Sequence, residues 1–300
     1  MTRILIVGAG ATGGAFGTLL QEAGRDVTYL VRSRRAEVLR QGGLRFISPT
    51  GDRTHRVRAL VAGATDEQFD LVLVTVKAAA LQRAIAEVQP HVGADGRVIP
   101  VLNGMAQIDV LESYFPGRVL GGSVKIVATL DGEVVRQLTG LAALTIGPLN
   151  GASMPRSIVE VLDVPGSQLT ISVDIIGVLW EKWAFIVAGN VIACLFRNAV
   201  GRVLEVGGLP WILEAIGEAE KVSEAAGYPI SAPAHDQCLA ILTEHGSSFT
   251  TSLYRDLVGG LPTEAEHLLG DFARRARDLG VPVPLLELTL VQIRAGAANS

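Results

Sequence analysis

The first half of the chain alternates short, continuous apolar runs with segments whose apolar residues recur at helical spacing. Residues 4–7 form the first apolar run, residues 11–23 carry the first helical pattern, and residues 27–31 form the next run. Continuous apolar runs are typical of strands that are buried on both faces of a parallel sheet. The pattern therefore predicts a strand–helix–strand unit at the start of the chain.

The alternation continues to about residue 146. The pattern predicts further strands at 70–76, 97–102, 119–128, 134–138 and 144–146, and helices at 78–88 and 107–114. Residues 42–61 are less regular, and two β-rich runs around Pro49-Thr50-Gly51-Asp52 indicate a hairpin-like excursion. Strands separated by helices favour the α/β class, with a Rossmann-type, doubly wound parallel sheet.

The β pattern ends near Asp174. Helical patterns then cover residues 175–200, 211–226, 234–245, 263–279 and 284–297, with glycines between them. We therefore expect two domains: a Rossmann-type domain over residues 1–170 and an all-helical domain over residues 171–300. This plan is common among dehydrogenases, which bind the substrate in the cleft between the two domains.

Composition narrows the class of protein. The net charge of −4 over 300 residues argues against a general nucleic-acid binder. Cys194 and Cys238 are isolated in the sequence, which is typical of buried thiols in a reducing compartment. The apolar run 183–196 is shorter than the roughly 20 residues that a membrane span needs, so we expect a buried core helix and no membrane association.

Three further expectations concern location and partners. The chain begins directly with a predicted strand, so we expect no signal peptide and a cytoplasmic protein. The five histidines show no ligand spacing, so we expect no metal site. The apolar helical half would suit a homodimer, although the sequence does not fix the oligomeric state.

A glycine motif joins the first strand to the first helix. It reads Gly8-Ala9-Gly10-Ala11-Thr12-Gly13. In such a motif the first glycine permits the tight turn, the second lets the backbone approach a pyrophosphate, and the third lets the helix pack close to the strand. The helix N-terminus offers N–H groups and a positive dipole end to phosphates. A turn without a ligand is the alternative, but it would not need three placed glycines.

The residue after the second strand distinguishes the two nicotinamide dinucleotides. NAD-binding units usually carry an acidic residue there, whereas this chain carries Arg32. A guanidinium can bind a 2′-phosphate with two hydrogen bonds, which predicts NADP(H) as the cofactor. Arg34 and Arg35 follow, and their roles stay open between phosphate binding and a solvated face.

Polar residues end two of the other predicted strands and interrupt the most apolar helix. Lys77 and Asn103 follow strands, at the edge of the sheet where open α/β folds bind ligands. Lys182 and Asn190 are eight residues apart (190 − 182) and so lie near one face of the helix. A lysine beside buried surface can donate a proton, but it can equally snorkel to solvent, and Asn190 can be a hydrogen-bonded core residue.

Together these segments resemble ketopantoate reductase, the NADPH-dependent 2-dehydropantoate 2-reductase family of pantothenate biosynthesis. The resemblance covers nearly the whole chain. It rests on the glycine motif, Arg32, Val74-Thr75-Val76-Lys77-Ala78, Leu102-Asn103-Gly104-Met105, Leu179-Trp180-Glu181-Lys182, Thr251-Ser252-Leu253-Tyr254-Arg255-Asp256 and Pro262-Thr263-Glu264.

The resemblance implies roles for these residues. Lys182 matches the family's catalytic acid, and Glu264 matches its acidic partner. Asn190 and Ser252 match substrate-binding residues, while Lys77 and Asn103 match residues at the junction of cofactor and substrate. Without the resemblance, the local sequence predicts helix capping for Ser252 and a helix N-terminus for Glu264.

Two positions depart from the family pattern. Ile186 stands where an asparagine follows the catalytic lysine by four residues, and Phe249 stands where a polar residue precedes the substrate serine by three. Both changes make the expected pocket more apolar. A site that loses a hydrogen-bonding partner loses discrimination for a substrate hydroxyl. These departures leave two substrates open: 2-dehydropantoate, or a related 2-oxo acid that lacks the hydroxyl.

We therefore expect an enzyme that transfers hydride from NADPH to the C2 carbonyl of 2-dehydropantoate or a related 2-oxo acid, with Lys182 as general acid. The first alternative is a non-catalytic NADP(H)-binding regulatory protein, which would not need Lys182 and Glu264. A methyltransferase that uses S-adenosylmethionine ranks last, because it normally has an acidic residue where Arg32 stands. The stereochemistry of the reduction cannot be derived from the sequence.

Overall fold

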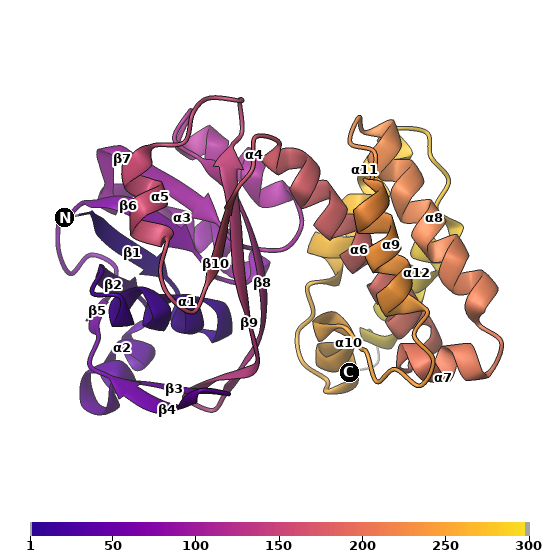
Figure 1. Cartoon of the computed structure of the whole chain (residues 1–300), viewed down its shortest axis with the longest axis horizontal. Coiled ribbons are helices and arrows are strands. Elements are labelled where there is room, and N and C mark those ends of the chain that lie inside the picture. Colours follow the sequence, from indigo (N-terminus) through magenta and orange to yellow (C-terminus); the bar gives the residue numbers. More distant parts are fainter. Residues whose placement is uncertain (1, 298–300) are drawn as a thin grey trace. The chain divides into compact units, whose positions relative to one another are not determined.

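The computed structural model describes residues 2–297 and divides them between two compact units (Figure 1). The first unit comprises Met1–Leu102 and Gln107–Ile175, and the second comprises Asn103–Ala106 and Ile176–Ser300. The first unit thus runs five residues (175 − 170) past the expected boundary. Its last strand, β10, pairs with β9 of the same unit, which keeps residues 168–171 there.

The first unit contains a five-stranded, wholly parallel sheet. Its strands are β1 (Arg3–Val7), β2 (Asp26–Leu30), β5 (Arg58–Leu60), β6 (Phe69–Val74) and β7 (Val92–Pro100). The spatial order β5-β2-β1-β6-β7 reverses direction at β1. This is the doubly wound topology that the sequence predicts, and its switch point lies between β1 and β6.

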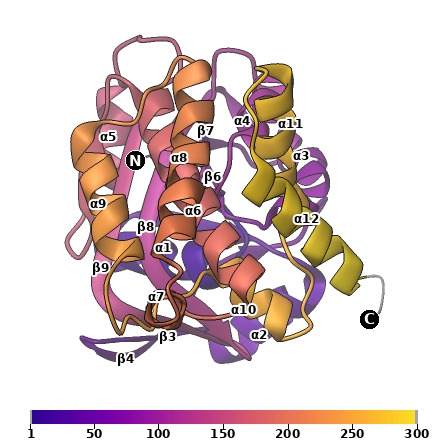
Figure 2. The same cartoon turned by 90° about the vertical axis from the view of Figure 1, so that its right-hand side faces the viewer.

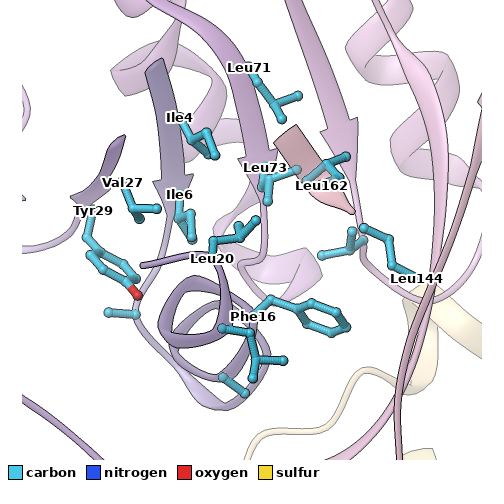
Figure 3. Close-up of a cluster of buried hydrophobic side chains, with 14 of the residues drawn as sticks. Ile4, Ile6, Phe16, Leu20, Val27, Tyr29, Leu71, Leu73, Leu144 and Leu162 are labelled. Atoms are coloured by element: carbon cyan, nitrogen blue, oxygen red, sulfur yellow. The ribbon is translucent and has the colours of Figure 1, made fainter. Parts of the chain in front are cut away.

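Strand β1 is buried on both faces. Ile4 and Ile6 belong to one hydrophobic cluster, while Leu5 and Val7 belong to the other. Figure 3 shows Ile4 and Ile6 directed toward the same cluster as Leu20. The two-residue period of a strand explains why the sequence of β1 is continuously apolar.

Helices surround the sheet. They are α1 (Ala11–Glu22), α2 (Ser33–Gly42), η1 (Ala78–Ala80), α3 (Leu81–Val88), η2 (Gln89–His91), α4 (Ala106–Tyr114) and α5 (Arg156–Leu162). Buried residues of α1 join the cluster of Ile4, whereas buried residues of α3 join the cluster of Leu5. The two clusters therefore cover opposite faces of the sheet.

This unit also contains a second sheet, which the sequence pattern did not distinguish from the first. It contains β3 (Leu44–Ser48), β4 (Gly51–His55), β8 (Leu120–Asp131), β9 (Val134–Pro148) and β10 (Gln168–Ile171). Strands β8 and β9 form a long antiparallel hairpin (Figure 1). The two-residue loop at Gly132 permits only antiparallel pairing, because a parallel partner requires a long crossover. The expected strands 134–138 and 144–146 are one strand, β9.

The second unit is helical, as predicted, and Figure 2 turns it toward the viewer. Its helices are α6 (Ile175–Phe196), α7 (Val200–Glu205), α8 (Leu209–Ala225), α9 (Ala232–Leu242), α10 (Ser252–Val258), η3 (Glu266–Gly270), α11 (Asp271–Asp278) and α12 (Pro284–Ala297). The helix expected over 175–200 ends earlier, because Arg197 adopts a left-handed conformation with φ of 52°. The helix expected over 263–279 contains the π-helical turn η3.

Helix α6 is the one described helix that is long and apolar enough to cross a membrane. However, 61% of its most apolar window is buried within the protein. Core helices of globular proteins pass the same test of length and composition. Cys194 on α6 is buried, as is Cys238 on α9, and burial raises the pKa of each thiol to about 12.

Candidate active site

The glycine motif forms the turn between β1 and α1. Gly8 has a φ of 103°, a conformation that would be strained for a residue with a side chain. The Thr75 hydroxyl, which follows β6, donates toward the carbonyls of Val7 and Gly8 at 2.9 and 3.0 Å. A Cβ on Gly13 would lie 2.2 Å from the Gly8 carbonyl oxygen. Gly8 and Gly13 therefore have the turn and packing functions that the motif predicts.

The surroundings of Gly10 differ from those of Gly13. A Cβ on Gly10 would meet nothing within 4 Å. Gly10 is also the N-cap of α1, and no side chain among residues 2–297 caps the N–H groups of the first turn, which begins with Ala11 and Thr12. Open space in front of uncapped N–H groups fits a pyrophosphate. The residues present thus fit a dinucleotide.

The three arginines after β2 have different environments. Arg35 donates to the Ala9 carbonyl at 3.1 Å and pairs with the Glu133 carboxylate, so it braces the glycine loop. The Arg34 side chain is 92% exposed. Arg32 is exposed at the carboxyl end of β2, and no ion pair involves its side chain within residues 2–297. Among the three, Arg32 is therefore the guanidinium best placed to meet a phosphate.

Lys77 and Asn103 lie in different units, although both follow strands of the parallel sheet. Lys77 is exposed three residues after β6, and as the N-cap of η1 its carbonyl accepts a hydrogen bond from the N–H of Ala80, the last residue of η1. Asn103 follows β7 but belongs with residues 104–106 to the second unit. The division does not contradict the position of both residues after strands, and their sharing of one site stays a prediction.

Residues 103–106 are held by the C-terminal half of the chain. The His267 Nε2 lies 2.8 Å from the Asn103 carbonyl oxygen. Gly104 has a φ of 88°, and a Cβ there would lie 3.1 Å from the same Nε2. The segment therefore rests on the imidazole. The sequence gives no signal for His267, whose role depends on a contact between residues 164 positions apart.

Helix α6 carries two of the predicted site residues. Lys182 is half-buried, and Asn190 is 1% exposed. The spacing places them near one face, separated by about 12 Å along the axis. The Asn190 Oδ1 is buried and accepts no hydrogen bond from the described residues. This finding argues against a satisfied core asparagine, because an orphaned buried acceptor costs about 1–3 kcal/mol.

Two aromatic residues lie beside this part of α6. The Phe185 and Phe249 rings are 6.0 Å apart. A Cβ on Gly189 would lie 3.6 Å from a Phe249 ring atom and 3.4 Å from a Thr251 methyl carbon. The segment that contains Phe249 and Thr251 therefore packs directly on α6, one turn from Ile186. Ile186 itself lies one helical turn before Asn190.

Ser252 and Glu264 occupy helix starts. The side chain of Thr251, not that of Ser252, caps α10, because its hydroxyl accepts from Tyr254 N–H at 3.1 Å. Ser252 is the first residue of that helix and is exposed. Glu264 is half-buried two residues before η3, and its carbonyl accepts from Leu268 N–H at 2.9 Å. Capping therefore does not account for the Ser252 hydroxyl.

Metal ligands do not cluster in the described part of the chain. Residues 2–297 contain no group of three or more His, Cys, Asp or Glu side chains arranged to hold an ion. The chemistry-bearing residues are instead a lysine, a glutamate, two asparagines and a serine in the second unit, and a glycine loop with basic residues in the first.

Comparisons with known proteins agree on one family. The model described as "Ketopantoate reductase PanE/ApbA" matches residues 4–151, and its C-terminal counterpart matches residues 174–297. The oxidoreductase YkpB of Bacillus subtilis, whose function is uncharacterised, is 31% identical over 297 residues, covering 97% of this chain and 98% of that protein.

Two solved structures have similar folds. A PanE/ApbA family ketopantoate reductase from Ralstonia eutropha JMP134 is 25% identical, with a TM-score of 0.89 and coverage of 99% of both chains. D-mandelate dehydrogenase, solved with NADH and anilino(oxo)acetate, also has a TM-score of 0.89, covering 99% of this chain and 98% of that one. At 19% identity, the second likeness concerns the fold alone.

Proposed function

The chain belongs to the ketopantoate reductase family of oxidoreductases, and we propose on this premise that it reduces the C2 carbonyl of a 2-oxo acid with NADPH. The reaction would yield a 2-hydroxy acid, as in the conversion of 2-dehydropantoate to pantoate. The observation that carries the proposal lies on α6, where half-buried Lys182 precedes Asn190 by about two turns and the buried Asn190 Oδ1 accepts no hydrogen bond from residues 2–297.

The first unit supplies the cofactor-binding groups of this proposal. The N–H groups at the start of α1 and the open side of Gly10 would hold the pyrophosphate. Arg32 would hold the 2′-phosphate, and Lys77 would lie near the reacting end. When bound, a reduced nicotinamide supplies a hydride. NADH serves the structurally similar D-mandelate dehydrogenase, so preference for NADPH is a separate test.

The second unit supplies the groups that act on the carbonyl. Lys182 donates a proton to the carbonyl oxygen, and its positive charge stabilises the oxygen as negative charge develops. Glu264 orients the lysine. Asn103, Asn190 and Ser252 bind the polar groups of the substrate. The buried Asn190 Oδ1 would gain a hydrogen-bond donor when the substrate binds.

Two apolar residues, Ile186 and Phe249, stand where the family pattern has polar residues, and they support a substrate other than 2-dehydropantoate. Ile186 offers no hydrogen bond, and Phe249 packs with Phe185 against the same helix. A polar substrate hydroxyl would lose its partners in such a site, whereas an apolar substituent would gain contact. We therefore propose a 2-oxo acid whose substituent lacks that hydroxyl.

The test is turnover of 2-dehydropantoate and of 2-oxo acids with alkyl or aryl substituents, each with NADPH and NADH. The protein should oxidise NADPH with at least one of them. Lys182→Ala should lower kcat by a factor of about 100 or more, since general acid catalysis contributes 10²–10⁴. Lys221→Ala, an exposed lysine on α8, is the matched control. Tight NADPH binding without any turnover would instead favour the regulatory alternative.

A further inference from the structure

The turn after Glu264 is π-helical. Leu268 N–H donates to the Glu264 carbonyl, four residues back, whereas Asp271 N–H donates to the Glu266 carbonyl, five residues back. One extra residue therefore widens the turn over Glu266–Gly270 and rotates the following residues by about 100°. Such turns are rare and frequently occur at functional sites.

Two neighbouring residues of this turn hold two different segments. His267 Nε2 contacts the Asn103 carbonyl oxygen at 2.8 Å, as described above. The Leu268 carbonyl accepts from the Trp183 indole N–H at 3.0 Å. The turn thus fixes both the backbone of Asn103 and the side chain that directly follows Lys182.

Trp183 is held on its other sides as well. The indole is fully buried. The Phe272 ring meets it edge-on at 4.8 Å, and the Arg275 guanidinium lies 5.5 Å from its ring centroid. Both partners lie on α11, directly after the turn. Trp183 is therefore packed tightly against α11, and its hydrogen bond to the Leu268 carbonyl fixes α6 relative to the turn.

A third contact fixes the start of the turn. Arg294 on α12 donates two hydrogen bonds, at 2.7 and 2.8 Å, to the Glu266 carboxylate. This ion pair lowers the pKa of Glu266. Because Glu264 lies only two residues earlier, its backbone is anchored by the same contact. The turn Glu266–Gly270 is therefore held by contacts with Asn103, with α6 and with α12.

We propose that the turn Glu266–Gly270 sets the relative positions of Lys182, Glu264 and Asn103, with Trp183 and His267 as positioning residues. The inference rests on the proposed function for the roles of those three groups. Each positioning residue acts through another residue. Trp183 acts through Lys182, which precedes it in the chain, and His267 acts through Asn103, whose carbonyl it contacts. Small displacements matter, because a shift of about 1 Å can cost a factor of about 100 in rate.

The experiment compares removal of each hydrogen bond with a matched control. Trp183→Phe should lower kcat about tenfold, whereas Trp180→Phe, the same change in the same aromatic cluster, should leave kcat within about twofold. The Trp180 indole N–H makes no hydrogen bond to the described residues. His267→Leu should raise the KM for the oxo acid about tenfold, and His267→Gln, which keeps a donor, should restore most of it. The Kd for NADPH should not change.

A second measurement does not depend on turnover. Hydrogen–deuterium exchange of peptides that cover residues 103–106 should accelerate in His267→Leu but not in His267→Gln. Unchanged exchange in His267→Leu, or equal losses of kcat in Trp183→Phe and Trp180→Phe, would overturn the inference. If the wild-type protein reduces no oxo acid, the proposed function fails, and the exchange result then decides whether His267 holds the segment.

Discussion

Gly10 and Gly13 belong to one motif but are glycine for different physical reasons. Gly13 faces the Gly8 carbonyl and the Thr75 hydroxyl, so the folded backbone itself excludes a side chain. Gly10 faces open space and has an extended conformation that alanine adopts readily, with φ of −86°. The fold itself therefore does not require glycine at position 10, and the proposed pyrophosphate is the reason that we expect for it.

Alanine substitutions should separate these two reasons. Gly13→Ala should lower the free energy of unfolding by about 1–3 kcal/mol, because its Cβ would lie 2.2 Å from a backbone oxygen. Gly10→Ala should change it by less than about 0.5 kcal/mol but raise the Kd for NADPH at least about tenfold. Urea denaturation and NADPH titration measure the two effects. Wild-type NADPH affinity in Gly10→Ala would contradict the phosphate-binding role.

Residue type and position along the chain predict a role for Arg32, but they do not predict the contacts that Arg35 makes. Arg32 follows from the end of a strand, and its exposure in the structure is consistent with that interpretation. Arg35, two residues before Glu37 in the same helix, braces Ala9 through a contact 26 residues away. No local sequence pattern distinguishes an arginine that binds a backbone carbonyl from one that is available to bind a phosphate.

At the level of elements, Glu67 connects three strands of the parallel sheet. It precedes β6, and its carboxylate pairs with Arg3 of β1 and Arg58 of β5. Hydrogen bonds from Arg58 and Arg3 lower the pKa of Glu67 from 4.5 to about 2. The carboxylate therefore stabilises the folded state above about pH 4.5, and this contribution is lost as the pH falls toward 2.

Glu67→Gln should test this contribution. The Tm of the variant should lie below that of the wild type above pH 5, and the difference should shrink as the pH falls from 4.5 toward 2. Scanning calorimetry across this range provides the measurement. Glu37→Gln, which removes an exposed carboxylate paired within α2, is the control. A Tm difference that is independent of pH would show that Glu67 acts through packing rather than charge.

Most elements follow from periodicity, and the misses have a common cause. The strands β1, β2 and β6 and the long helices lie within a few residues of their predicted places. The membership of β8 and β9 in a second sheet, and the π-helical turn within 263–279, were missed. Both depend on hydrogen bonds that the spacing of hydrophobic residues does not encode. In the sheet these bonds join separate strands, and in the π-helical turn an N–H bonds to the carbonyl five residues back.

Over the whole molecule, each unit carries a different part of the proposed chemistry. The glycine loop, Arg32 and Lys77 belong to the first unit, and Lys182 and Glu264 belong to the second. Cofactor binding and catalysis should therefore respond to different substitutions.

NADPH should stabilise the protein by mass action. At an NADPH concentration of 100 times the Kd, the free energy of unfolding of the unit that binds NADPH should rise by about 2.7 kcal/mol. Lys182→Ala should keep this gain, whereas Arg32→Ala should lose most of it at the same NADPH concentration. Thermal unfolding with and without NADPH tests both. Equal gains in wild type and Arg32→Ala would contradict the assignment of the 2′-phosphate.

The sequence by itself determined the class of fold, the glycine loop, the basic residue after β2 and the resemblance to one family, because these depend on local spacing and residue type. Only the tertiary structure decided that Asn103 belongs with the helical unit, that Arg35 braces the loop, and that Trp183 and His267 meet one π-helical turn. Those facts depend on contacts between residues far apart in the chain. Such contacts form only when the packed elements bring the residues together.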